Sequence, residues 1–121
     1  MQTRSFCYIE DQIDGLFKLL LSDYSQPINI GNPSEITIRD FADEIIKLTN
    51  TTQKVIYKDL PVDDPLQRRP DISLAKQILN WEPKTKRHKG LQHTLDYFKS
   101  LPPEKWYETA HKTFTNYIRN K

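Results

Sequence analysis

The sequence has little cysteine, little glycine and no long apolar run. Its 121 residues include one cysteine, Cys7, so it can form neither an internal disulfide nor a multi-cysteine zinc site. The three glycines, Gly15, Gly31 and Gly90, are too dispersed for a Gly-rich phosphate loop, which excludes the usual dinucleotide-binding fingerprint. The longest aliphatic run, residues 19–21, is far shorter than the roughly 20 residues that span a bilayer. We therefore expect no membrane span.

The sequence also lacks a large excess of either positive or negative charge. Eighteen basic and 16 acidic residues give a formal net charge of +2, which is too balanced to indicate a nucleic-acid-binding protein. The polar residues 1–5 run directly into a strand-like segment, so we expect neither a secretory signal nor a transit peptide. With the single cysteine, this predicts a cytoplasmic location.

Strand and helix patterns alternate along the chain. The predicted elements are strand 5–9, helix 11–21, strand 28–30, helix 38–48, strand 54–60, helix 74–79, helix 90–100 and helix 103–118. Thr37 and Asp40 predict a capping-box-like start for the second helix, and Asp71 or Ser73 caps the third, which Asn80 ends. This alternation predicts an α/β fold with a small, partly parallel sheet covered by helices.

The loop over residues 61–70 contains the first candidate site. Arg68 and Arg69 stand between prolines and outside any helix or strand period, so their guanidinium groups can project together toward a pyrophosphate. Spacing alone favours the alternative, a surface loop with local ion pairs. In that alternative three nearby aspartates neutralise the arginines: Asp63, Asp64 and Asp71.

Two other features carry positive charge. Arg4 stands just before the first predicted strand, where a strand end can aim a side chain into a crevice, although a lone arginine is more often solvated. The basic run over residues 84–89 precedes a predicted helix, where its charge opposes the helix dipole. No aromatic residue is interleaved within it, so a solvated face is favoured over docking to a phosphate or nucleic-acid backbone.

Nucleophilic and metal chemistry is not visible in the pattern. His88, His93 and His111 have no metal-ligand partners at helical spacing, and no serine lies in a Gly-x-Ser-x-Gly turn. We therefore predict neither catalytic nor metal-binding residues.

Four segments of the sequence match one family in order. They are residues 3–11 (TRSFCYIED), 27–33 (PINIGNP), 63–72 (DDPLQRRPDI) and 79–83 (LNWEP). Over roughly residues 2–100 the chain resembles the UDP-glucuronate decarboxylases, which are lyases of the NAD-dependent epimerase/dehydratase group of extended short-chain dehydrogenases. The resemblance implies the C-terminal, substrate-binding subdomain of such an enzyme, without its Rossmann domain. The tail beyond residue 100 is expected to have no counterpart in the family.

The resemblance also implies roles for individual residues. In the family, the arginine matching Arg4 and one of the pair matching Arg68 and Arg69 contact the UDP diphosphate. Tyr8 is a weaker candidate for the wall around the nucleotide or sugar, and a packed aromatic ring is the alternative. The Tyr-x-x-x-Lys at residues 117–121 follows the substrate portion, whereas the family's catalytic motif precedes it, so it is not a catalytic counterpart.

These implications define the expected function. Residues 1–100 are expected to be a nucleotide-sugar-binding subdomain, not catalytic alone, and residues 101–121 an amphipathic helical tail. NAD is the cofactor of the parent family and is expected to have no site in this chain. The expected partners are a UDP-sugar, bound weakly by the chain alone, and either the missing Rossmann domain or a second subunit. The alternative is a free-standing, non-catalytic nucleotide-sugar-binding or protein-interaction module.

Overall fold

The computed structural model describes residues 1–102. The predicted tail helix over 103–118 and the Tyr-x-x-x-Lys lie outside the described residues. The chain divides into two compact units, Met1–Leu91 and Gln92–Lys121. Along the described part the elements are β1 (Thr3–Ser5), α1 (Ile9–Leu20), β2 (Glu35–Thr37), α2 (Ile38–Thr49), β3 (Gln67–Arg68), α3 (Ser73–Leu79) and α4 (Arg87–Ser100).

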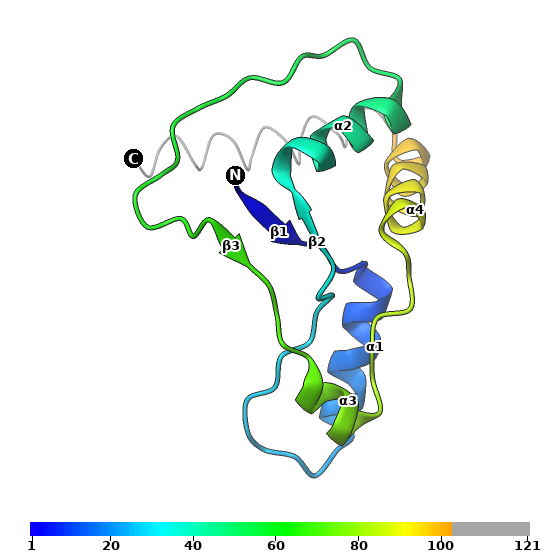
Figure 1. Ribbon diagram of the computed structural model, residues 1–121. Helices are drawn as coiled ribbons and strands as arrows, with labels where there is room; N and C mark the ends of the chain where they lie inside the picture. The colour runs from blue at the N-terminus through cyan, green and yellow to red at the C-terminus, as the bar shows by residue number, and fades with distance from the viewer. Residues whose placement is uncertain (103–121) are drawn as a thin grey trace. The chain divides into compact units, whose positions relative to one another are not determined.

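The sheet of the first unit is mixed, with β1 in the centre (Figure 1). β1 runs antiparallel to β2 and parallel to β3. In this register Arg4 is opposite Ile36 on one side and Arg68 on the other. The predicted α/β fold with a partly parallel sheet is therefore confirmed.

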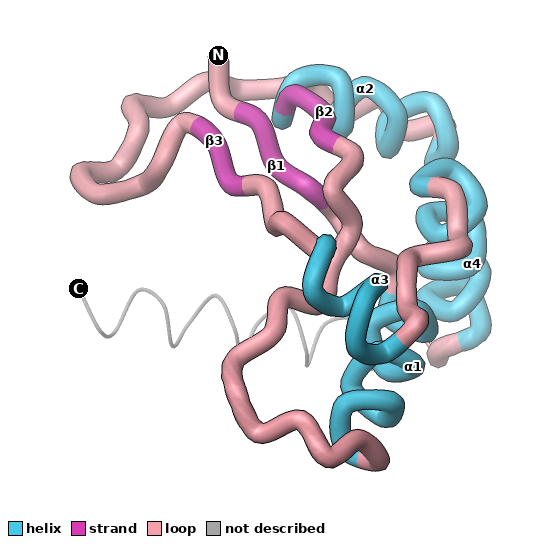
Figure 2. The backbone as a smooth tube through the Cα atoms, turned by 60° about the horizontal axis from the view of Figure 1, so that its bottom comes forward, coloured by secondary structure: helices cyan, strands magenta, loops and turns pink. Residues whose placement is uncertain are grey.

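A small apolar core lies where α1 and α3 pack side by side (Figures 1 and 2). Gly15 allows Trp81 to approach α1 closely, because a Cβ atom at position 15 would lie 2.9 Å from Cε2 of the indole. The Trp81 indole N–H donates to the Asp11 carbonyl oxygen at 3.2 Å. The buried residues of this core are Ile72, Ala75, Leu79 and Trp81, and Leu19, Ile28 and Ile30 pack against them.

Two helix boundaries follow the signals in the sequence, whereas the N-cap of α3 is Ile72 and not the predicted Asp71 or Ser73. Thr37 Oγ1 accepts the backbone N–H of Asp40 at 3.0 Å, which confirms the predicted cap of α2. Asn80 ends α3 in the left-handed conformation, as predicted for its C-terminus. α4 begins at Arg87, which is earlier than residue 90, the predicted start.

The three strand predictions are wrong in position. The segment 5–9 contributes only Ser5 to a strand, because Tyr8 is already the N-cap of α1. Residues 28–30 form no strand and instead pack two isoleucines on the core. Residues 54–60 also form no strand, and Ile56 in this segment is 76% exposed. β-propensity measures how well a residue fits against a neighbouring strand, so a β-rich segment without such a neighbour stays irregular.

The described part of the second unit is the remainder of α4, residues 92–100, and the two residues after it. In this part Gln92 Nε2 donates to Asp96 Oδ1 at 2.8 Å, and the rings of Tyr97 and Phe98 meet edge to face with centroids 5.5 Å apart. None of the helices described is long and apolar enough to cross a membrane.

Candidate functional site

The sheet separates Arg68 from Arg69. Residues in register on neighbouring strands point to the same face, and successive residues of one strand point to opposite faces. Arg4 and Arg68 are Cα partners, so they share one face. Glu35 is in register with Ser5 and belongs to the other face, where Arg69 Nη1 lies 3.8 Å from its Oε2. Of the two adjacent arginines, Arg68 is therefore the one beside Arg4.

The Arg4 side chain is partly buried, and its guanidinium is held from two sides. Its Nη2 donates to Asp64 Oδ1 at 2.6 Å, and its Nη1 donates to the Thr3 carbonyl oxygen at 2.7 Å. The Arg4 side chain is 17% exposed. Asp64 thus pairs with Arg4 and not with Arg68 or Arg69, so it does not form the ion pair within the loop that the alternative interpretation expects.

The opposite face of the sheet is organised by Glu35. Its carboxylate accepts hydrogen bonds from Thr3 Oγ1 and Gln67 Nε2, each at 2.8 Å. The hydrogen bond from Gln67, then that from Thr3 and the charge of Arg69, lower the pKa of Glu35. Arg69 therefore faces an ionised carboxylate of the same chain, whereas the exposed Arg68 does not share that face.

Tyr8 lies at the N-terminus of α1 and packs against Gly90. A Cβ atom at position 90 would lie 3.1 Å from Cδ2 of the Tyr8 ring. Partial burial, followed by the charges of Glu10 and Asp11, raises the pKa of the Tyr8 phenol. This packing is what the alternative interpretation of Tyr8 expects, and a role beside a nucleotide or sugar stays a prediction.

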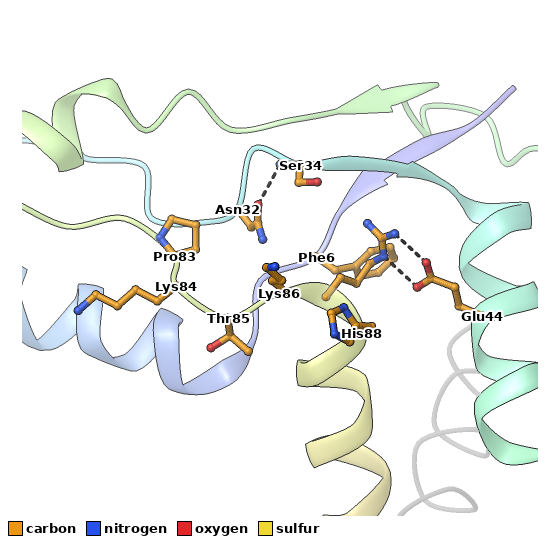
Figure 3. A pocket seen from close by; sticks show the side chains of 10 residues that line it. Phe6, Asn32, Ser34, Glu44, Pro83, Lys84, Thr85, Lys86 and His88 are labelled. Carbon is orange, nitrogen blue, oxygen red and sulfur yellow. Dashed lines mark hydrogen bonds and ion pairs between the residues drawn. The ribbon is translucent and has the colours of Figure 1, made fainter.

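A pocket of about 350 Å³ lies between Phe6, the loop at Asn32 and the start of α4 (Figure 3). Part of the basic run, residues 84–88, lines it, and none of the predicted site residues does. Arg87 donates through Nε and Nη2 to the two carboxylate oxygens of Glu44, at 2.9 and 2.7 Å. Glu44 thus neutralises part of the positive charge at this helix start, a partner that the sequence pattern did not reveal.

Residues 1–102 offer no glycine-rich loop of the kind that holds NAD. A dinucleotide loop needs clustered glycines whose backbone can approach the pyrophosphate. Each glycine here instead packs against a side chain: Gly15 against Trp81, Gly31 against Pro70 and Gly90 against Tyr8. Nor do residues 1–102 bring together three His, Cys, Asp or Glu side chains that could hold a metal ion. We therefore assign no chemical step to NAD or to a metal ion.

The known proteins with similar sequences are UDP-glucuronic acid decarboxylases. UDP-glucuronic acid decarboxylase 5 of Arabidopsis thaliana is 48% identical over 90 residues, which are 74% of this chain and 26% of that protein. UDP-glucuronic acid decarboxylase 1 of Xenopus tropicalis is 38% identical over 117 residues, which are 97% of this chain and 26% of that protein. No family model matches the chain.

Solved structures agree on the fold. UDP-glucuronic acid 4-epimerase from Bacillus cereus, solved with UDP-glucuronic acid and NAD, aligns with a TM-score of 0.73 and 32% identity over 84% of this chain and 33% of that chain. dTDP-glucose 4,6-dehydratase from Bacillus anthracis, solved with NAD, aligns with a TM-score of 0.74 and 24% identity over 90% of this chain and 34% of that chain.

The fold is that of the NAD-dependent nucleotide-sugar epimerases and dehydratases, within the short-chain dehydrogenases. Within this class the chain belongs with the UDP-glucuronic acid decarboxylases and corresponds to a C-terminal portion of them. It spans about a quarter of the length of the curated relatives it matches. The match to the Xenopus tropicalis protein includes most of the residues after 100, so the expectation that the tail has no counterpart is wrong.

Proposed function

We propose that this chain is the UDP-sugar-binding portion of a UDP-glucuronic acid decarboxylase-like enzyme, and that Arg4 and Arg68 contact the diphosphate. The observation that carries the proposal is their register: two motif arginines, 64 residues apart in sequence, are partners on adjacent parallel strands. Adjacent strands lie about 4.8 Å apart, and guanidinium groups form paired, charge-assisted hydrogen bonds with phosphates. A relative solved with UDP-glucuronic acid supports the ligand class.

The chain is proposed to bind a nucleotide-sugar and not to transform it alone. The packing of all three glycines against side chains supports this, because it leaves the described residues without a glycine-rich loop for NAD. The proposed partner is therefore a Rossmann domain that carries NAD, in the same polypeptide or in a separate one. The cytoplasmic location remains a prediction from the sequence.

An exposed apolar stripe on α1 supports such a partner. One side of α1 packs against Trp81 through Gly15, while the other side presents large apolar side chains that are between 52% and 77% exposed. These residues recur at helical spacing: Ile9, Ile13, Leu16, Phe17 and Leu20. A helix that is apolar on two sides is typical of one buried between two layers. We propose that the Rossmann domain covers this stripe.

Calorimetric titration of the folded chain with UDP tests the binding role. We expect weak, saturable binding, because the chain spans only part of its relatives and a partial site retains only part of the binding energy. Arg68→Gln should weaken it about tenfold, since a hydrogen bond to a charged group is lost. The matched control is Arg39→Gln, which removes an exposed arginine from α2 and should leave binding unchanged.

Two results would contradict the proposal. If a folded sample gives no heat with millimolar UDP, the binding role is wrong. If the isolated chain decarboxylates UDP-glucuronic acid when NAD is added, its non-catalytic status is wrong.

A further inference from the structure

We infer that Asp64 is a positioning residue that fixes the Arg4 guanidinium for an anionic ligand; this inference rests on the proposed function of the Arg4–Arg68 face. Asp64 bridges two donors at the start of the chain. Its Oδ1 accepts from Arg4 Nη2 at 2.6 Å, and its Oδ2 accepts from Gln2 Nε2, also at 2.6 Å. Both carboxylate oxygens are therefore used in holding this end of β1.

The chain delivers Asp64 to this place through a tight turn. The Asp64 N–H donates to the Pro61 carbonyl oxygen at 3.2 Å, and Asp63 adopts the left-handed conformation with φ 73°. Just beyond the turn, the Leu66 carbonyl oxygen accepts the Thr3 N–H at 2.9 Å, where β3 joins β1. The loop is thus tied to β1 through both its backbone and the Asp64 carboxylate.

The pairing leaves Arg4 able to bind a ligand. A guanidinium has five N–H donors, and Arg4 uses two of them, toward Asp64 and toward the Thr3 carbonyl. The other three make no hydrogen bond among the described residues, and the orientation of the guanidinium is already fixed, so less side-chain entropy is lost when an anion binds. The carboxylate also offsets the repulsion between Arg4 and its strand partner Arg68.

The chemistry of the bridge requires a carboxylate. Arg4 and Gln2 are both donors to Asp64, so an amide at this position would direct its own NH₂ group at one of them. Asp64→Asn therefore breaks at least one of the two hydrogen bonds while it keeps the size of the side chain. Asp63→Asn is the matched control: it makes the same charge change next door, at an exposed residue whose left-handed backbone asparagine tolerates.

The experiment has two readouts, which are measured on the wild type and on three variants: Asp64→Asn, Asp63→Asn and Asp64→Glu. The first is the NMR signal of the Arg4 Nε–H, assigned with Arg4→Lys, which reports how firmly the guanidinium is held. The second is the dissociation constant for UDP. We expect Asp64→Asn to shift and broaden the Arg4 signal and to weaken UDP binding about fivefold relative to Asp63→Asn. Asp64→Glu, which keeps the charge and moves the carboxylate, should lie between wild type and Asp64→Asn in both readouts.

The outcomes separate this inference from the proposed function. If UDP does not bind the wild type, the proposed function fails, and the Arg4 signal still decides whether Asp64 fixes the guanidinium. If UDP binds and Asp64→Asn leaves the Arg4 signal unchanged, or binds UDP as tightly as Asp63→Asn or more tightly, the inference is wrong. Should Asp64→Asn fail to fold, Asp64→Glu decides in the same way, because an unchanged Arg4 signal there also overturns it.

Discussion

Asp11 connects α1 to a segment that lies 70 residues further along the chain. Its backbone carbonyl accepts the indole N–H of Trp81, and its carboxylate accepts the backbone N–H of Thr85 at 2.9 Å and the Thr85 hydroxyl at 3.1 Å. Asp11 and Trp81 belong to two of the segments that carry the family resemblance. At the residue scale, part of that resemblance therefore reflects packing around the core and not contact with a ligand.

Asp11→Ala should lower the free energy of unfolding by about 1–3 kcal/mol, because it leaves the partly buried donors of Thr85 without an acceptor. Urea unfolding followed by tryptophan fluorescence measures the change. The control is Asp14→Ala on the same helix, whose carboxylate makes only an exposed pair with Lys18 and which should change stability by less than about 0.5 kcal/mol. Equal losses in both variants would show that the Asp11–Thr85 contact contributes little.

At the scale of elements, helices were predictable from the sequence and strands were not. α2 and α3 carry local signals, a Thr37 cap and an Asn80 terminator, that act within a few residues. β2 and β3 are three and two residues long, too short to show an alternating pattern, and their partners lie far away in sequence.

The candidate site was also predictable only where the signal is local in the sequence. Arg4, Arg68 and Arg69 could be singled out from sequence and resemblance, but Arg68 could not be separated from Arg69 without the register of β1 and β3. Asp64 was visible only as one of several acidic residues that could neutralise the loop. Its pairing with Arg4 depends on a contact between residues 60 apart, which no local pattern reports.

The Arg87–Glu44 pair joins the start of α4 to α2 and gives this contact a pH dependence. The hydrogen bond from Arg87 is the main cause that lowers the pKa of Glu44 below its ordinary value of 4.5. A carboxylate whose pKa is lowered on folding stabilises the fold above its ordinary pKa, and that contribution is lost as the pH falls through the folded value. The free energy of unfolding should therefore decrease as the pH is lowered below 4.5.

Glu44→Gln should make this decrease less steep, as measured by urea unfolding at a series of pH values from neutral to acidic. The slope should not vanish, because Glu35, Asp71 and Glu82 also have lowered pKa values. Asp43→Asn, which removes a neighbouring carboxylate from an exposed pair with Arg39, is the control and should keep most of the wild-type slope. If Glu44→Gln keeps the wild-type slope as well, the pair does not couple folding to pH.

At the scale of the whole molecule, little apolar surface is buried within the described residues. Their buried apolar side chains are Ile36, Ile72, Ala75, Leu79 and Trp81. Hydrophobic stabilisation scales with buried apolar area, and this small set of buried side chains therefore contributes modestly to folding. The stripe on α1 exposes large apolar residues at the same time, and contiguous apolar patches of this kind mark interaction surfaces.

Phe17→Gln combined with Leu20→Gln should change association and leave folding intact. Both side chains are more than half exposed, 56% and 77%, so the free energy of unfolding should change by less than about 1 kcal/mol. Binding of a hydrophobic dye should fall, and so should co-purification with a separately produced NAD-binding portion of a UDP-glucuronic acid decarboxylase.

Leu19→Gln, on the side of α1 that packs against the core, is the opposite control and should destabilise the fold. If the double variant retains full co-purification, the NAD-binding portion does not use this stripe. If co-purification is lost while the free energy of unfolding is unchanged, the NAD-binding portion packs on this stripe of α1.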